Sequence, residues 1–259
     1  MPDLNVSWQK ILHDAIHTPG RISEAYSRFH NYSVGNQLLA LFQCSARSLQ
    51  PGPIATFMRW KELGRHVRKG EKALTLCMPV SCKAKHSSRD EQGNETEQEI
   101  PFTRFVYRNN WFVLSQTEGA EYKPEPLPDW SESTALASLA IERIPFDELN
   151  GNIQGYARGR KVAINPVAAM PHKTLFHELA HVVLGHTAEA NLNNGSERTP
   201  RSLGEVEAEC VALLCCESLG LPGAEFSRGY IQSWGSEIPE RSAQKIFHAA
   251  DVILKAGVL

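Results

Sequence analysis

The chain contains the stretch His177-Glu178-Leu179-Ala180-His181. On a helix, residues that are four apart lie on one face about one turn from each other, so the two imidazoles can bind the same metal ion. The carboxylate between them can reach a metal-bound water and act as its general base. The stretch therefore predicts a metal-binding helix, with Glu178 as a catalytic residue.

The flanking residues favour this helix and add a strand. We predict a helix from Thr174 to Gly185, with Thr174 as its N-cap and the glycine as its stop. Lys161–Pro166 has the composition of a short strand that ends at Asn-Pro. A strand beside a metal-binding helix could hold an extended substrate by main-chain pairing, as a peptidase requires. The alternative is a surface helix with two unrelated histidines.

A third protein ligand is expected, because catalytic zinc usually binds three side chains and a water. One class of enzymes with this pattern has a histidine six residues after the second one. Here that position is Thr187, and His186 lies one residue too early. The other common solution is a glutamate on a following helix, and residues 204–212 offer three.

The helical face of each glutamate distinguishes the three. Glu205 and Glu209 share a face at positions i and i+4, whereas Glu207 points about 160° away from Glu205. We therefore predict Glu205 as the third ligand, with Glu207 as the alternative. We expect Glu209, and also His186, to orient a ligand histidine. The predicted ligands of a zinc ion (Zn2+) are His177, His181 and Glu205, a gluzincin-like set.

The composition is that of a globular protein with two modest domains. The chain has 259 residues and a net charge of −2. Residues 1–80 carry ten Lys and Arg against five Asp and Glu, whereas the rest carries 17 against 24. This asymmetry favours two functions in one chain.

Nothing at the N-terminus resembles a secretory signal, and no stretch is apolar for long enough to span a bilayer. Three of the six cysteines, Cys210, Cys215 and Cys216, lie on an apolar segment, which is typical of reduced, buried thiols. We interpret Cys77 and Cys82 as packing residues too. These features predict a cytoplasmic protein without a membrane partner.

Periodicity predicts helices, and then strands, in the N-terminal half. Ser7 is a suitable cap for a first helix that ends at Pro19-Gly20. The other expected elements are helices at 22–29, 33–45 and 56–63, strands that end near 82 and span 102–107 and 111–114, and a loop at 86–98. The Pro-rich Lys123–Asp129 marks a boundary. We predict an α+β fold with two domains, residues 1–125 and 132–259, joined by a linker at 126–131.

Basic and aromatic residues alternate in residues 54–72. Cations beside Phe57 and Trp60 could follow a phosphate backbone while the rings stack on bases, which is what single-strand binding needs. A solvated amphipathic helix with its aromatic residues inward is the alternative. The cations are Arg59, Lys61, Arg65, Arg68, Lys69 and Lys72.

Six stretches together resemble a known family. Three resemble the N-terminal domain of ArdC-type antirestriction proteins, namely Phe29–Leu39, Trp60–Glu71 and Val113–Gly119. Three resemble the zincin-like metallopeptidase domain of the same proteins, which is related to ImmA/IrrE-type peptidases: Gln154–Ala157, His177–His186 and Glu205–Ala212. The stretches follow the family's order over nearly the whole chain.

The resemblance implies a single-stranded DNA-binding (ssDNA-binding) N-terminal helical and antiparallel-sheet domain, followed by a zinc metallopeptidase domain. Such proteins are carried by mobile genetic elements, and they protect incoming DNA from host restriction. The chain departs from the family pattern at Gly204 and by its additional Glu207. The family's metal ligands and catalytic base match His177, His181 and Glu205, and Glu178.

The predicted reaction is hydrolysis of a peptide bond by metal-activated water. Zinc would lower the pKa of its bound water toward about 7 and polarise the scissile carbonyl. Glu178 would take the proton of the water and pass it to the leaving amine. Tyr230 is the candidate, from its sequence position, for stabilising the oxyanion.

Two other functions are compatible with the sequence. The chain could be a non-proteolytic ssDNA-binding shield with a structural or vestigial metal site, or a protease whose basic residues bind a protein partner. The sequence specifies neither the peptide substrate nor the oligomeric state. The residues expected to contact DNA are Tyr32, Asn36, Trp60, Arg65, Arg68 and Lys69.

Overall fold

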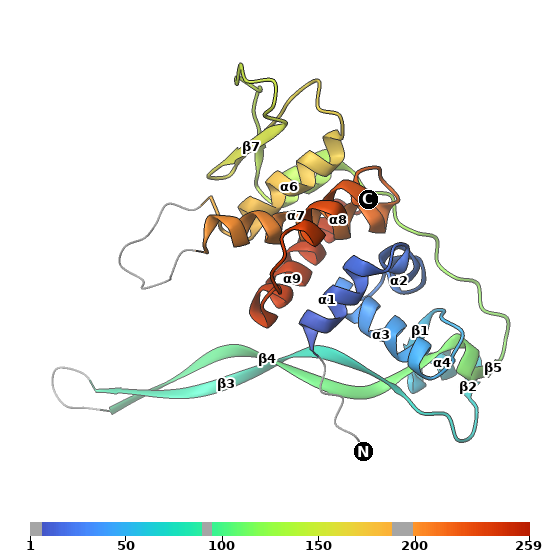
Figure 1. Cartoon of the computed structure of the whole chain (residues 1–259). Coiled ribbons are helices and arrows are strands. Elements are labelled where there is room, and N and C mark those ends of the chain that lie inside the picture. Colours follow the sequence, from blue (N-terminus) through green and yellow to red (C-terminus); the bar gives the residue numbers. More distant parts are fainter. Residues whose placement is uncertain (1–6, 90–94, 188–198) are drawn as a thin grey trace. The chain divides into compact units, whose positions relative to one another are not determined.

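The computed structural model describes residues 7–89, 95–187 and 199–259, and it combines helices with small sheets (Figure 1). This confirms the predicted α+β class. The chain forms two compact units. The first consists of Met1–Phe42 and Lys123–Leu259, and the second is Gln43–Tyr122.

The first unit is built around one buried helix, α7 (Arg201–Leu219). Every residue from Val206 to Cys216 is buried, so α7 is covered on all sides, and it packs against four other helices. The other helices of the unit are α1 (Trp8–His17), α2 (Arg21–Phe29), α5 (Glu132–Ser138), α6 (Pro171–Val183), α8 (Ala224–Ser233) and α9 (Glu240–Ala256), and α3 (Val34–Ala46) runs across the division between the units. The partners of α7 are α2, α6, α8 and α9.

Two side chains, Ser7 and Glu240, accept hydrogen bonds from the backbone at the start of α1. The Ser7 hydroxyl accepts the Lys10 N–H and caps α1, as predicted. The carboxylate of Glu240, on α9, accepts the backbone N–H groups of Trp8 and Gln9. These bonds satisfy amide groups that a helix start leaves without intrahelical partners.

The helix α6 begins at Pro171, three residues before the predicted start at Thr174. Proline suits the first turn, because its fixed φ is helical and its missing N–H would have no partner there. The Thr174 hydroxyl does not cap the helix, and it donates instead to the Met170 carbonyl. After the helix, Gly185 has a φ of 79°, so the predicted stop is confirmed.

A three-stranded sheet lies beside α6. Its order is β6 (Glu142–Arg143), β8 (Lys161–Ile164) and β7 (Gly155–Arg158), so the predicted strand at 161–166 is the central one. Because β8 is paired with a strand on each side, it is not the strand that could receive a substrate. The strand β7 is an edge strand that packs on α6, and it is better placed for that role.

The second unit is dominated by a long antiparallel ribbon of β3 (Leu74–Arg89) and β4 (Glu95–Val113). The prediction of two separate strands at 102–107 and 111–114, joined by Arg108–Asn110, is wrong, because β4 runs through these residues and pairs there with the start of β3. The predicted loop at 86–98 is strand at both ends, and its middle lies outside the described residues. The remaining elements are β1 (Ile54–Thr56), α4 (Phe57–Glu62), β2 (Arg65–Val67), the 3-10 turn η1 (Leu114–Gln116) and β5 (Thr117–Gly119).

Residues 123–129 have no regular secondary structure, as expected of a linker. The domain boundaries at 125 and 132 remain predictions, since the compact units follow spatial proximity and group α1 and α2 with the C-terminal helices. None of the six cysteines forms a disulfide, and Cys77 and Cys82 are partly exposed on β3. Among the described helices, none has the length and apolar character needed to cross a membrane.

Candidate metal centre

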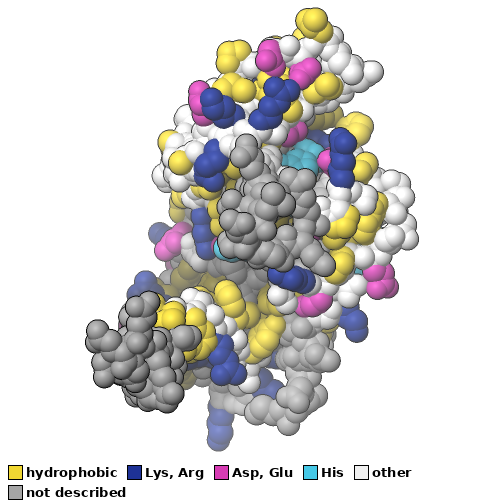
Figure 2. Space-filling model, turned by 90° about the vertical axis from the view of Figure 1, so that its left-hand side faces the viewer, with side chains coloured by type: hydrophobic (Ala, Val, Ile, Leu, Met, Phe, Trp, Pro, Cys, Tyr) yellow, Lys and Arg dark blue, Asp and Glu magenta, His cyan; other side chains and the backbone are white. Residues whose placement is uncertain are grey.

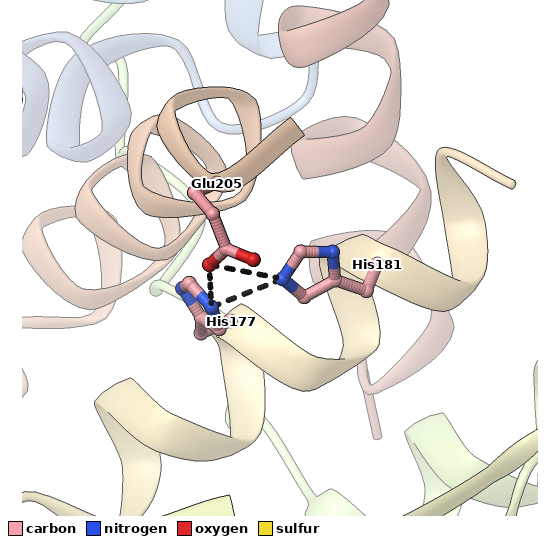
Figure 3. Close-up of side chains that lie close together, drawn as sticks. All are labelled: His177, His181 and Glu205. Carbon is pink, nitrogen blue, oxygen red and sulfur yellow. Dashed lines mark hydrogen bonds and ion pairs between the residues drawn. The ribbon is translucent and has the colours of Figure 1, made fainter. Parts of the chain in front are cut away.

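Two helices bring three candidate ligands together (Figure 3). His177 and His181 lie on successive turns of α6, and their Nε2 atoms are 3.1 Å apart. Oε2 of Glu205, near the start of α7, lies 3.4 Å from Nε2 of His177 and 3.7 Å from Nε2 of His181. Within the described part of the chain, these side chains are the group of His, Cys, Asp and Glu that could hold a metal ion.

The spacing of the three atoms fits one divalent ion. Ligand atoms that lie about 2.0–2.1 Å from a tetrahedral zinc are separated from each other by about 3.3–3.4 Å. The observed separations, 3.1, 3.4 and 3.7 Å, lie on both sides of that value. Two imidazoles and one carboxylate also form a donor set that suits zinc.

His177 carries a second contact on the far side of its ring. Its Nδ1 lies 3.3 Å from Oε1 of Glu209, in a close ion pair rather than an aligned hydrogen bond, and Lys173 donates to the same oxygen. Burial alone would lower the pKa of His177, but the carboxylates of Glu205 and Glu209 outweigh it and raise this pKa to about 9. The structure thus places Glu209 where it can orient His177.

The carboxylates of these pairs are held in their ionised form. Burial opposes this for Glu209, yet His177 and Lys173 lower its pKa to about 2. The contact with His177 holds the pKa of Glu205 well below its usual range. In the absence of a metal, the site is therefore a cluster of ion pairs centred on a protonated His177.

Glu178 lies in a different environment. Its side chain is buried, and burial raises its pKa, although His177 and His181 act in the opposite direction. Gly155 on β7, for which no individual role was predicted, allows the strand to approach this helix. A Cβ at Gly155 would come within 2.7 Å of Thr174 Cγ2 and 3.3 Å of Glu178 Cγ. A glycine inside a strand was the available signal for such a close approach.

His186 and Glu207 form a separate chain of contacts. His186 Nδ1 lies 3.0 Å from Nδ1 of His181, and His186 Nε2 lies 3.0 Å from Oε2 of Glu207. The alternative third ligand, Glu207, thus contacts His186 and not the Nε2 pair. Glu207 is buried, since its exposed fraction is 1%.

Tyr230 is on α8 and is exposed. Partial burial, together with the charges of Glu205 and Glu209, raises its pKa. The role of Tyr230 in stabilising the oxyanion stays a prediction.

The residues predicted to bind DNA differ in their availability. Trp60 is only 1% exposed, and its indole N–H donates to the Phe112 carbonyl, so its prediction as a stacking residue is wrong. Asn36 is also buried, and Tyr32 is half-buried; both lie in the first compact unit. In the second unit, Arg68 and Lys69 are exposed.

Arg65 is half-buried in the second unit. It donates to the side chain and carbonyl of Thr117 and to the Ala120 carbonyl. These bonds connect β2 with β5 and with Ala120, which follows β5. A structural role of Arg65 therefore accompanies any DNA contact.

The ribbon of β3 and β4 exposes aromatic residues that the sequence did not single out. Phe102, Phe105 and Tyr107 are 47%, 66% and 45% exposed on β4. Arg104 and Arg108 stand between and beside them on the same strand. In the view of Figure 2, hydrophobic side chains lie at the surface beside Lys and Arg, and Asp and Glu are also present there. Aromatic residues within a predicted strand could have indicated this surface. The prediction of two separate strands, at 102–107 and 111–114, made the ribbon appear shorter than it is.

Comparisons with known proteins agree with this architecture. Residues 3–108 match the model of a family described as the N-terminal domain of anti-restriction factor ArdC. The Mn(II)-bound crystal structure of antirestriction protein ArdC from plasmid R388 is 21% identical, with a TM-score of 0.52 over 96% of this chain and 97% of that one. The metal-free structure of the same protein is 23% identical, with a TM-score of 0.49 over 96% and 94%.

A curated relative is longer. It is an uncharacterized protein of Bacillus anthracis, pXO2-81, which is 26% identical over 273 residues. The match covers 83% of this chain but 43% of the relative, so the chain spans less than half the length of that protein.

Proposed function

We propose that this chain, an ArdC-type protein in its N-terminal domain and in its fold, is a zinc-dependent metallopeptidase that also binds single-stranded DNA. The observation that carries the peptidase proposal is the convergence of His177, His181 and Glu205 beside the buried carboxyl group of Glu178. The related ArdC structure contains Mn(II), which supports a divalent metal in this site. We favour zinc because of the donor set.

A divalent cation held by His177, His181 and Glu205 would supply Lewis acidity to a substrate carbonyl and to an attacking water. Glu178 accepts the proton of that water at a carboxylate oxygen and delivers it to the leaving amine. Its raised pKa suits this exchange, because a base that binds the proton more tightly takes it more readily from water. Burial of the carboxyl group keeps bulk water from competing for that proton.

Other residues position the substrate. The edge strand β7 can pair with an extended peptide, and Gly155 brings that strand against α6. Tyr230 can donate its phenolic hydrogen to the carbonyl oxygen as negative charge develops there. The phenol is protonated at neutral pH, as a donor must be, since its pKa is raised from an ordinary value that is already well above neutral.

Labelled casein is a suitable general probe for this activity. The zinc-loaded full chain should hydrolyse it, and a chelator should stop the reaction until zinc is restored. Absence of hydrolysis with one zinc bound per chain would favour the alternative function, a non-proteolytic shield with a structural metal site.

The DNA-binding proposal rests on the family match of residues 3–108 and on the surface of the β3–β4 ribbon. Aromatic side chains stack on bases of any sequence, and nearby cations contact phosphates. We propose Phe102, Phe105 and Tyr107 as stacking residues in place of Trp60. Arg68, Lys69, Arg104 and Arg108 would then contact the phosphate backbone.

Binding to a fluorescein-labelled thymidine oligonucleotide, followed by anisotropy at several salt concentrations, tests this second function. Contacts with phosphates release counterions, so the affinity should fall steeply as salt rises. Affinity that does not depend on salt would instead favour a protein partner for these residues.

A further inference from the structure

A chain of three side chains leads from the candidate ligand His181 into the core. Gly185, with its positive φ, turns the chain after α6, and the His186 N–H then bonds to the His181 carbonyl. This turn lays the two imidazoles against each other, with ring centroids 5.2 Å apart. The next contact is Glu207 on α7, which also bonds to the Ser242 side chain on α9.

The hydrogen-bonding capacity of each group assigns the protons in this chain. A carboxylate only accepts, so the hydrogen between His186 and Glu207 must be on Nε2 of His186. With that hydrogen on Nε2, Nδ1 of His186 is the ring atom that can accept a hydrogen bond from His181. The 3.0 Å contact between the two Nδ1 atoms therefore needs its hydrogen on Nδ1 of His181. In that tautomer the lone pair of His181 is on Nε2, on the side where His177 and Glu205 lie.

We propose that Glu207, acting through His186, is a positioning residue that fixes His181 as the Nδ1–H tautomer and so prepares it to bind metal. The inference rests on the proposed metal site, and it gives each of the two ligand histidines a supporting glutamate. Glu209 contacts His177 directly, whereas Glu207 reaches His181 only through the intervening imidazole. Residues two apart on a helix point in different directions, so the two glutamates contact different side chains.

Two variants interrupt the His181–His186–Glu207 contacts at different positions. Glu207→Gln keeps the shape of the side chain but adds a donor, which allows His186 to change its tautomer. His186→Ala removes the link and changes only a residue beyond the end of α6. Glu209→Gln is the matched control, because it also removes a buried charge from α7 but acts on His177. Circular dichroism should show that all three variants are folded.

The first measurement is long-range nitrogen–proton NMR of the histidine rings in the metal-free full chain. Wild type should show His181 protonated at Nδ1, whereas Glu207→Gln and His186→Ala should populate both tautomers. Glu209→Gln should leave His181 unchanged. A single Nδ1–H tautomer of His181 in both test variants would overturn the proposal. This readout needs no metal, so it is separate from any failure of the proposed function.

The second measurement is zinc affinity in a chelator-buffered titration. Loss of a residue that orients a metal ligand typically weakens binding about 10- to 100-fold, and we expect this range for His186→Ala. The conservative variant His186→Gln can still accept from His181 and donate to Glu207, so it should recover most of the affinity. Equal affinities of wild type and His186→Ala would contradict the proposal, even if zinc binds normally.

Discussion

Nε2 of His177 lies 3.4 Å from Oε2 of Glu205, although the first residue is in the middle of α6 and the second is near the start of α7. The crossing of these two helices is what turns a pair of histidines into a site with three ligand atoms. A Cβ added at Gly204, near the start of α7, would lie 3.5 Å from the His186 ring, so this end of α7 packs closely on the residues that follow α6. The three-ligand arrangement therefore depends on the packing of α6 against α7 as much as on the spacing of the two histidines.

Removal of Glu205 should remove the metal. We expect Glu205→Ala to retain much less than one zinc per chain after dialysis, because only two ligands remain. Glu207→Ala should still bind one zinc, with lower affinity. Elemental analysis of the purified variants measures both contents. Loss of zinc from the Glu207 variant alone would show that Glu207, not Glu205, is the third ligand.

Metal binding should release a proton at neutral pH. The pKa of His177 is raised to about 9 in the metal-free chain, so its imidazole is charged at pH 7 and must lose a proton to bind metal. Calorimetric titration with zinc should therefore be more exothermic in the buffer with the larger ionisation enthalpy. Equal heats in two such buffers would mean that no proton leaves, and the protonated state assigned to His177 would be wrong.

The same shift predicts how the stability of the metal-free chain depends on pH. The folded-state pKa of His177 is above its unfolded value of 6.5, so its contribution is complete below that pH and is lost as pH rises through about 9. The thermal midpoint measured with chelator should fall over this interval. Added zinc should reverse the trend, since the ligand form of His177 becomes more available as pH rises.

Substitution of Gly155 should separate β7 from α6. In Gly155→Ala, the new Cβ would lie 2.7 Å from Thr174 Cγ2 and 3.0 Å from the Ala163 carbonyl oxygen, so the strand must move. Overpacking of this kind typically costs about 1–3 kcal/mol in the free energy of unfolding, which urea denaturation measures. The matched control is Gly151→Ala, where nothing lies within 4 Å of the added carbon. Equal stabilities of the two variants would contradict the assigned contact.

The β3–β4 ribbon should carry part of the DNA affinity. Loss of one stacked base costs about 1–3 kcal/mol, which is roughly a 5- to 150-fold rise in Kd, and we expect this from Phe105→Ala. Anisotropy of the labelled thymidine oligonucleotide measures the change. Phe226→Ala removes an aromatic residue of similar exposure, 59% against 66% for Phe105, from α8 and should have no effect. Equal losses in both variants would point to a nonspecific cause.

The candidate metal site could be predicted from the sequence because helical periodicity fixes which side chains share a face. Glu205 and Glu209 were separated from Glu207 by direction alone, and the structure places all three accordingly. The sequence also indicated that His186 supports a ligand histidine, but it did not show which one, since the contact with His181 depends on the turn that Gly185 makes after α6.

The second unit was harder to predict, for physical reasons. An amphipathic pattern does not show whether an aromatic residue faces solvent or the core, and Trp60 proved to be buried. Polar residues at 86–98 are typical of a loop, but cross-strand pairing extends β3 and β4 into both ends of this segment. Strand pairing between distant residues leaves a weaker trace in sequence than helical periodicity does.

The most direct test of the central claim is the zinc content and casein hydrolysis of Glu178→Gln, measured on one sample beside wild type. The account predicts one zinc per chain in both proteins, because Glu178 is not a ligand, and a fall in hydrolysis of at least about 100-fold in the variant. Hydrolysis at the wild-type rate, with zinc bound, would contradict the role of Glu178 as the general base of a metallopeptidase.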